Sequence, residues 1–237
     1  MKIEKWTPPI ILILIALIFT ILGFYLPWWS IKMAPESEMA LNGTARADYG
    51  LLQVVTASRT IRNDTQLTAV PIANLTKSQE DLNAIASVFN STFALVVAGL
   101  VLSLASLVLV IISIRGKPMR RLATLATLLA AFLLFIAPLY ITSTLPTVAP
   151  KLTSLIPSTL VPNNPPFWLN QTLLVKPKDI TGFWGSIKIP SSSEFPAWAR
   201  DGNFWMWGPA SGWLLTFTAS LLLFVATILI NQIFVKE

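Results

Sequence analysis

The chain has 237 residues, of which 54% are hydrophobic and only 12% are charged, and its mean hydropathy is +0.67. Soluble domains carry about 25% charged residues, so this composition is typical of an integral membrane protein. Cysteine and histidine are both absent, which excludes disulfides, thiolate or imidazole metal ligands, haem-binding histidine, and Cys–His or Ser–His catalytic pairs. We therefore expect no cofactor, no bound metal and no enzymatic activity.

Four uncharged runs predict four transmembrane helices, over residues 10–29, 93–114, 122–141 and 212–234. Each run is long enough to cross a hydrocarbon layer of ~30 Å as one α-helix. The predicted fold class is an all-α membrane protein, a four-transmembrane-helix bundle with a small extracytoplasmic β-containing cap. The first run follows a basic segment, as in a signal peptide, but no small-x-small cleavage site follows it. We expect this run to remain as an uncleaved span.

The placement of lysine and arginine predicts the orientation of these spans. Segments 1–9, 115–121 and 235–237 hold seven cations and two acids, whereas segments 30–92 and 142–211 hold ten cations and nine acids. Because cationic loops remain in the cytoplasm, we expect a multi-pass protein of the plasma membrane with both termini cytoplasmic and both long loops extracytoplasmic. The net charge of +6 is then explained by the topology. The sequence has no concentrated basic face of the kind that nucleic-acid binding requires.

N-glycosylation sequons support the same orientation, because all of them fall in the two long loops. Roughly two would arise by chance in a chain of this composition, and the alternative reading is that threonine-rich loops generate the motif without function. We expect N-glycans on these loops, although the fourth sequon lies so close to a span that its modification is disfavoured. The candidate acceptors are Asn42, Asn63, Asn74, Asn90 and Asn170.

The first long loop contains signals for both strands and a helix. Runs 51–56 and 66–72 are rich in β-prone residues and flank the turn-forming pair Asn63-Asp64, which predicts a hairpin or a small antiparallel sheet. Residues 78–81 (SQED) resemble a capping box, and an apolar face at positions 82, 85, 86 and 89 follows. We expect this helix to continue unbroken into the second span.

Residues 142–206 of the second long loop hold nine of the seventeen prolines together with several aromatic residues. This composition predicts a packed irregular lid that folds back on the first loop's sheet. Tryptophans near the outer ends of the spans suggest an interfacial aromatic belt, with a ligand-stacking platform as the alternative. The belt residues are Trp28, Trp29, Trp205, Trp207 and Trp213.

Small residues form stripes along three of the predicted spans, and such stripes permit close helix packing in lipid. The predicted packing residues are Gly99, Ser103 and Ser106 in the second span, Ala123, Ala130 and Ala137 in the third, and Gly212, Thr216 and Ser220 in the fourth. No Asp, Glu, Lys or Arg lies within a predicted span, which disfavours a proton-coupled transporter. The acidic residues of the outer loops are interpreted as solvated charges.

The order of several short motifs resembles the claudin-like tetraspan superfamily, which includes the claudins and the peripheral myelin proteins. These motifs are Trp28-Trp29, Gly50-Leu51-Leu52 where claudins carry G-L-W, Asp81-Leu82, and the RLATLA run at 121–126. The resemblance implies a four-helix bundle under an extracellular β-sheet, and roles in adhesion, lateral polymerisation, paracellular barriers or auxiliary channel subunits. The chain departs from claudins because it lacks their two loop cysteines and has a longer second loop.

The sequence therefore predicts a non-catalytic structural or assembly protein whose outer cap and small-residue helix faces contact other membrane proteins or further copies of the chain. One alternative is an accessory subunit of a larger membrane complex, such as a respiratory enzyme, without cofactor ligands. A second alternative is a small-solute channel or transporter. The absence of cysteine and histidine beside many sequons would suit a glycoprotein of hot or acidic surroundings, as in some archaea.

Overall fold

A computed structural model describes residues 2–35, 44–59, 65–72, 80–114, 119–148, 183–189 and 203–235. The chain divides into two compact units. The helical unit comprises Met1–Leu26, Asn90–Ile141 and Ser211–Glu237, and the sheet unit comprises Pro27–Phe89 and Thr142–Ala210.

Four long helices dominate the described chain: α1 (Lys2–Tyr25), α3 (Glu80–Ser113), α4 (Arg120–Val148) and α6 (Ser211–Val235). Each is long and apolar enough to cross a membrane. The hydropathy pattern therefore located all four. Helix α3 begins at Glu80 without a break before its apolar part, as the capping signal predicted.

The first helix differs from its predicted bounds at both ends. Helix α1 begins at Lys2, includes Pro8 and Pro9 in its early turns, and ends at Tyr25 rather than at residue 29. Pro27 explains the early end, because a proline disfavours helical geometry in the residue before it. Trp29 instead opens a β-strand, so the last residues of the uncharged run 10–29 are not helical.

Contacts within the helical unit show that α3 runs antiparallel to both α1 and α4. Phe24, near the end of α1, lies with its ring centroid 5.3 Å from that of Phe93 in the first part of α3 that belongs to this unit. Further along α3, Ser106 shares a hydrogen bond with Thr127 near the start of α4. Because Thr127 Oγ1 also donates to the carbonyl of Ala123, its single hydrogen is used there and Ser106 Oγ is the donor between the helices.

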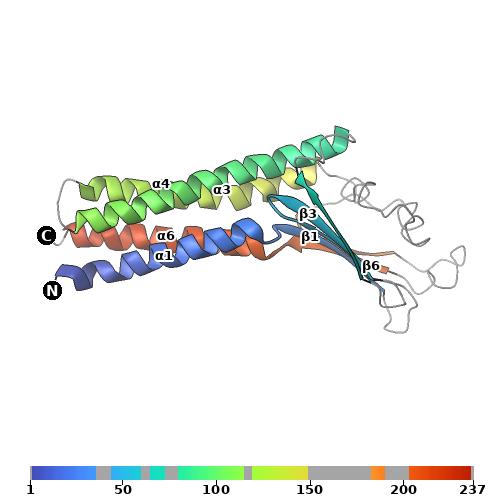
Figure 1. The fold of residues 1–237 in the computed structure, drawn as a ribbon, viewed down its shortest axis with the longest axis horizontal. Helices are drawn as coiled ribbons and strands as arrows, with labels where there is room; N and C mark the ends of the chain where they lie inside the picture. The colour runs from blue at the N-terminus through green and yellow to red at the C-terminus, as the bar shows by residue number, and fades with distance from the viewer. Residues whose placement is uncertain are drawn as a thin grey trace, which may run out of the picture. The chain divides into compact units, whose positions relative to one another are not determined.

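Helix α6 closes the bundle against α4 and α1. The rings of Phe135 in α4 and Phe217 in α6 are 5.6 Å apart. A Cβ atom added at Gly23 in α1 would lie 2.5 Å from Thr216 Oγ1 in α6, so glycine permits a close approach of these two helices. The up-down-up-down order brings the start of α1 and the end of α6 to one end of the helical unit (Figure 1).

The sheet unit holds one six-stranded sheet in the order β4-β3-β2-β1-β6-β5. Its strands are β1 (Trp29–Pro35), β2 (Thr44–Tyr49), β3 (Gln53–Arg59), β4 (Thr65–Pro71), β5 (Gly185–Ile189) and β6 (Asn203–Pro209). Every neighbouring pair is antiparallel. The predicted β3–β4 hairpin is present, but the sheet is larger than the predicted small β element.

The second long loop contributes strands to the sheet of the first. Strand β6 pairs with β1 along its full length, from Trp29 opposite Pro209 to Pro35 opposite Asn203. The predicted return of this loop to the first loop's sheet therefore occurs through regular strand pairing in its described part. The irregular lid predicted for the whole loop is wrong at β5 and β6, which are regular strands, and its residues 149–182 and 190–202 lie outside the described residues.

The core of the sheet unit lies on one face of the sheet. Trp29 and Ile31 in β1 are 1% exposed and stand opposite the buried Tyr49 and Trp207 respectively. Phe89 of α3 stacks on Tyr49 with 5.7 Å between ring centroids. Ile85, Ala86 and Phe89 are all buried, which agrees with the apolar face predicted for this helix.

Candidate interaction surface

The second face of the sheet combines exposed apolar and charged side chains. Side chains alternate between the two faces of a strand. Because Ile31 and Trp207 point into the core, their neighbours Lys32 and Met206 point to the opposite face, where they are register partners. We name this opposite face of β5, β6, β1 and β2 the outer face.

Two large apolar side chains lie next to each other on the outer face. Trp184 is 65% exposed and Met206 is 45% exposed. Trp184 directly precedes β5 and packs beside Gly208, where an added Cβ would be 3.3 Å from the Trp184 Cβ. Gly208 lies two residues beyond Met206 on the same face, so Trp184 and Met206 both belong to the outer face.

Charged side chains continue this surface onto β1 and β2. Lys32 stands opposite Arg46, a like-charge pair that is unfavourable by itself. Arg46 Nε lies 2.6 Å from one carboxylate oxygen of Asp48 and 2.7 Å from the other, so the Arg46 charge is compensated within its own strand. The outer face therefore presents an apolar patch of Trp184 and Met206 beside the exposed cation of Lys32.

The core face contains a second tryptophan–glycine pair and a buried phenol. A Cβ atom added at Gly185 would lie 2.7 Å from the Trp207 ring, so only glycine lets this ring cover β5. Tyr49 is fully buried, and among the described residues no hydrogen-bond partner lies within reach of its Oη. Burial raises the pKa of Tyr49 above its ordinary value, because the charged phenolate would be poorly solvated.

The structure assigns different environments to the five predicted belt tryptophans. Trp28, Trp29 and Trp207 are buried in the sheet unit, and Trp29 Nε1 donates to the Phe183 carbonyl at 2.8 Å. Strand periodicity turns Trp29 and Trp207 into the sheet core. Trp213 is half-buried in the helical unit, where it donates to the Pro138 carbonyl at 3.1 Å. The Trp205 side chain lies outside the described side chains.

The nine small residues predicted to mediate helix packing are all buried: Gly99, Ser103, Ser106, Ala123, Ala130, Ala137, Gly212, Thr216 and Ser220. Gly99 permits a close approach of α3 and α4, since an added Cβ would lie 2.6 Å from Leu134 Cδ2. The hydroxyls of Ser103 and Thr216 donate to carbonyls one turn earlier in their own helices. Such bonds satisfy polar side chains within an apolar bundle.

Among the predicted glycosylation acceptors, only Asn90 lies in the described part of the chain, where it is exposed on α3. Asn42, Asn63, Asn74 and Asn170 lie outside the described residues. Within the described ranges, no group of three or more Asp, Glu, His or Cys side chains is placed to hold a metal ion.

Sequence reasoning missed the outer face because it left residues 29–35 and 203–209 without strands. The alternation in Trp29-Ser30-Ile31-Lys32 was a signal for a half-buried strand. Trp184 was expected inside a packed lid, together with the Phe183 that precedes it. Phe183 is buried and Trp184 is exposed.

Comparison with known proteins does not assign the chain to a family: no family model matches it, and no curated protein matches it.

Proposed function

We propose that this chain is a non-catalytic, multi-pass membrane protein that assembles with other membrane proteins or with copies of itself through the outer face of its sheet unit. Four helices long and apolar enough to span a membrane support the membrane placement. In this proposal both termini are cytoplasmic and the sheet unit is extracytoplasmic, as the distribution of charges predicts. The claudin-like architecture that the sequence resemblance implies is part of the same proposal.

The main support for the assembly role is the exposure of Trp184 and Met206. Tryptophan, methionine and arginine are enriched at protein interfaces, and tryptophan is prominent among the residues that dominate binding energy. The outer face places these apolar groups beside Lys32 and the Arg46–Asp48 ion pair. A partner with an apolar pocket and a nearby carboxylate would complement this surface.

The chain contains no cysteine, so a single introduced cysteine provides a unique cross-linking site. We expect Ser186→Cys, beside Met206 on the outer face, to give a cross-linked product in native membranes with a bifunctional thiol–amine reagent. Replacing Trp184 by Ala and Met206 by Ser in the same chain should abolish that product. Mass spectrometry of the product distinguishes a second copy from a different subunit.

Leu52→Ser is the matched control, because Leu52 is 42% exposed in the sheet unit but belongs to the β2–β3 connection. This variant should cross-link as the parent does. A chain that remains monomeric in its own membrane, or equal loss of product in both variants, would contradict the proposed role of the outer face.

A further inference from the structure

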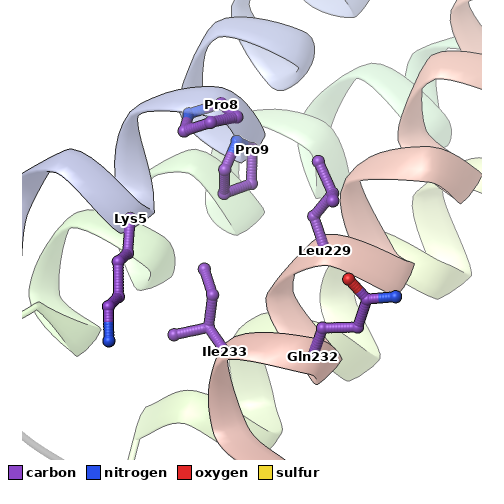
Figure 2. Close-up of a pocket in the computed structure, with 6 residues that line it drawn as sticks. All are labelled: Lys5, Pro8, Pro9, Leu229, Gln232 and Ile233. Carbon is purple, nitrogen blue, oxygen red and sulfur yellow. The ribbon is translucent and has the colours of Figure 1, made fainter. Parts of the chain in front are cut away.

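A pocket of about 260 Å³ lies between α1 and α6 in the helical unit (Figure 2). It is formed at the end of the unit where α1 begins and α6 ends. Its lining residues are Lys5, Pro8 and Pro9 from α1, and Leu229, Gln232 and Ile233 from α6.

The lining combines two polar side chains with four apolar ones. Lys5 and Gln232 are both exposed and line the pocket from different helices, Lys5 on the α1 side and Gln232 on the α6 side (Figure 2). Lys5 offers a cationic donor, and the Gln232 amide offers two N–H donors and one acceptor. The rest of the lining offers only apolar contacts, so the complementary ligand has an anionic head and a hydrocarbon portion.

The depth of the pocket matches a headgroup region. Lys5 is the first residue of one apolar span and Ile233 is the last residue of another. The start of α4 lies at the same end, where the Arg120 guanidinium stands 5.7 Å from the centroid of the Trp6 ring. Among the described residues, Lys2 and Lys5 of α1 and Arg120 and Arg121 of α4 lie at this end with one acid, Glu4, which favours an anionic ligand over a zwitterionic one.

From this arrangement we infer that the α1–α6 pocket binds an anionic phospholipid. Its phosphate contacts the Lys5 ammonium and the Gln232 amide, and the first part of an acyl chain lies against Pro8, Pro9 and Leu229. A free phosphate ion would leave the apolar lining unused. The inference rests on the membrane placement in the proposed function, but it is independent of the outer face of the sheet unit.

Native mass spectrometry of the full chain in mild detergent tests this inference, with phosphatidylglycerol and phosphatidylcholine as probes. We expect phosphatidylglycerol to be retained preferentially, and Lys5→Gln to weaken its binding about fivefold, as expected for loss of one basic contact. Ile233→Trp, which fills the pocket without changing charge, should also weaken binding. Both variants should retain the melting temperature of the parent chain.

Arg121→Gln is the matched control, because Arg121 is exposed at the start of α4 and its loss removes the same charge outside the pocket. This variant should bind phosphatidylglycerol as the parent does. Equal weakening by Lys5→Gln and Arg121→Gln, or equal retention of both lipids, would overturn the inference. Displacement of phosphatidylglycerol by millimolar inorganic phosphate would also overturn it, because it would identify a site for the free anion.

The same samples separate this inference from the proposed function. Failure of the chain to insert into phosphatidylcholine vesicles, measured by alkaline extraction, would refute the membrane placement itself. Normal insertion without lipid selectivity would refute only the pocket inference.

Discussion

At the scale of single residues, glycine–side chain contacts and buried polar atoms determine which substitutions the fold tolerates. Gly23, Gly99 and Gly185 each lie where an added Cβ would meet another side chain at less than 3 Å. The buried indole of Trp29 has its hydrogen-bond acceptor, whereas the buried phenol of Tyr49 has none among the described residues.

Gly99→Ala should lower the unfolding free energy of the helical unit by about 1–3 kcal/mol, the usual cost of overpacking. The added methyl group would meet Leu134 at 2.6 Å. Leu134→Ala should restore part of that loss in the double variant, since coupled neighbours are non-additive. Thermal unfolding in detergent measures the cycle. Ala98→Val, on the exposed side of α3, is the control. Additive effects of Gly99→Ala and Leu134→Ala on the unfolding free energy would contradict the contact.

Trp29→Phe should destabilise the sheet unit by about 1–3 kcal/mol, because the Phe183 carbonyl loses its buried donor. Trp184→Phe makes the same chemical change at a side chain that is 65% exposed, and it should leave stability nearly unchanged. Chemical denaturation followed by near-ultraviolet circular dichroism compares the two. A similar loss in both variants would contradict the burial assigned to Trp29.

Tyr49→Phe should be neutral or slightly stabilising at pH 7, because it removes a buried hydroxyl without a described partner. Burial raises the pKa of Tyr49 in the folded chain, so above the ordinary tyrosine pKa of about 10 the unfolded chain releases this proton and the folded chain keeps it. Parent stability should therefore fall more steeply with pH above about 10 than that of Tyr49→Phe. If the stability of the parent chain and that of Tyr49→Phe fall in parallel above about pH 10, Tyr49 makes no such contribution.

At the scale of elements, the sheet order separates interior strands from edge strands. Strand β1 lies between β2 and β6, whereas β4 and β5 end the sheet. Interior strands use their backbone donors on both sides, but an edge strand pairs on one side only. The central position of β1 explains why residues directly after the first span have a structural rather than a connecting role.

Hydrogen–deuterium exchange should follow this order. Amides in β1 and β6 should exchange more slowly than those in β4 and β5, because opening an edge strand breaks one ladder instead of two. The measurement belongs on the monomeric chain in detergent. If β4 exchanges as slowly as β1 in that sample, the strand order within the described sheet is incorrect. Added protection of β5 or β6 only in an oligomer would agree with assembly through the outer face.

At the scale of the whole molecule, the antiparallel order of the four helices groups the start of α1 and the end of α6 together (Figure 1). The start of α4 joins them through the contact between Arg120 and Trp6. The described cations of the basic segments, Lys2, Lys5, Arg120 and Arg121, lie at the starts of α1 and α4. The proposed function requires this end of the helical unit to lie in the cytoplasm. An experiment that identifies the compartment at this end therefore tests the orientation.

Single cysteines answer that question without a background, because the chain has none of its own. Leu52→Cys, in the β2–β3 connection away from the outer face, should react with a membrane-impermeant maleimide on intact cells, and Arg121→Cys at the start of α4 should react only after permeabilisation. Both side chains are exposed, so burial does not explain a difference. Labelling of Arg121→Cys on intact cells would reverse the proposed orientation.

The local pattern determined the four helices and the β3–β4 hairpin. An uncharged run of about twenty residues is apolar enough for a membrane helix wherever it lies, and two β-prone runs around Asn63-Asp64 are close enough to pair. The small-residue stripes were also visible locally, and Gly99, Ala130 and Ser220 are buried. The end of α1 was missed because hydropathy does not separate an apolar helix from an apolar strand, and Pro27 was the local signal that did.

The tertiary structure alone decided that Ile31 pairs with Trp207, and with that pairing it decided which side chains form the outer face. Hydrogen bonds between strands far apart in the chain select this register, and a shift of one residue would exchange the two faces of a strand. Composition places Trp28, Trp29 and Trp207 near the ends of spans, but their burial follows from that register. The exposure of Trp184 and Met206 has the same origin, because adjacent side chains on a paired strand must point to opposite faces.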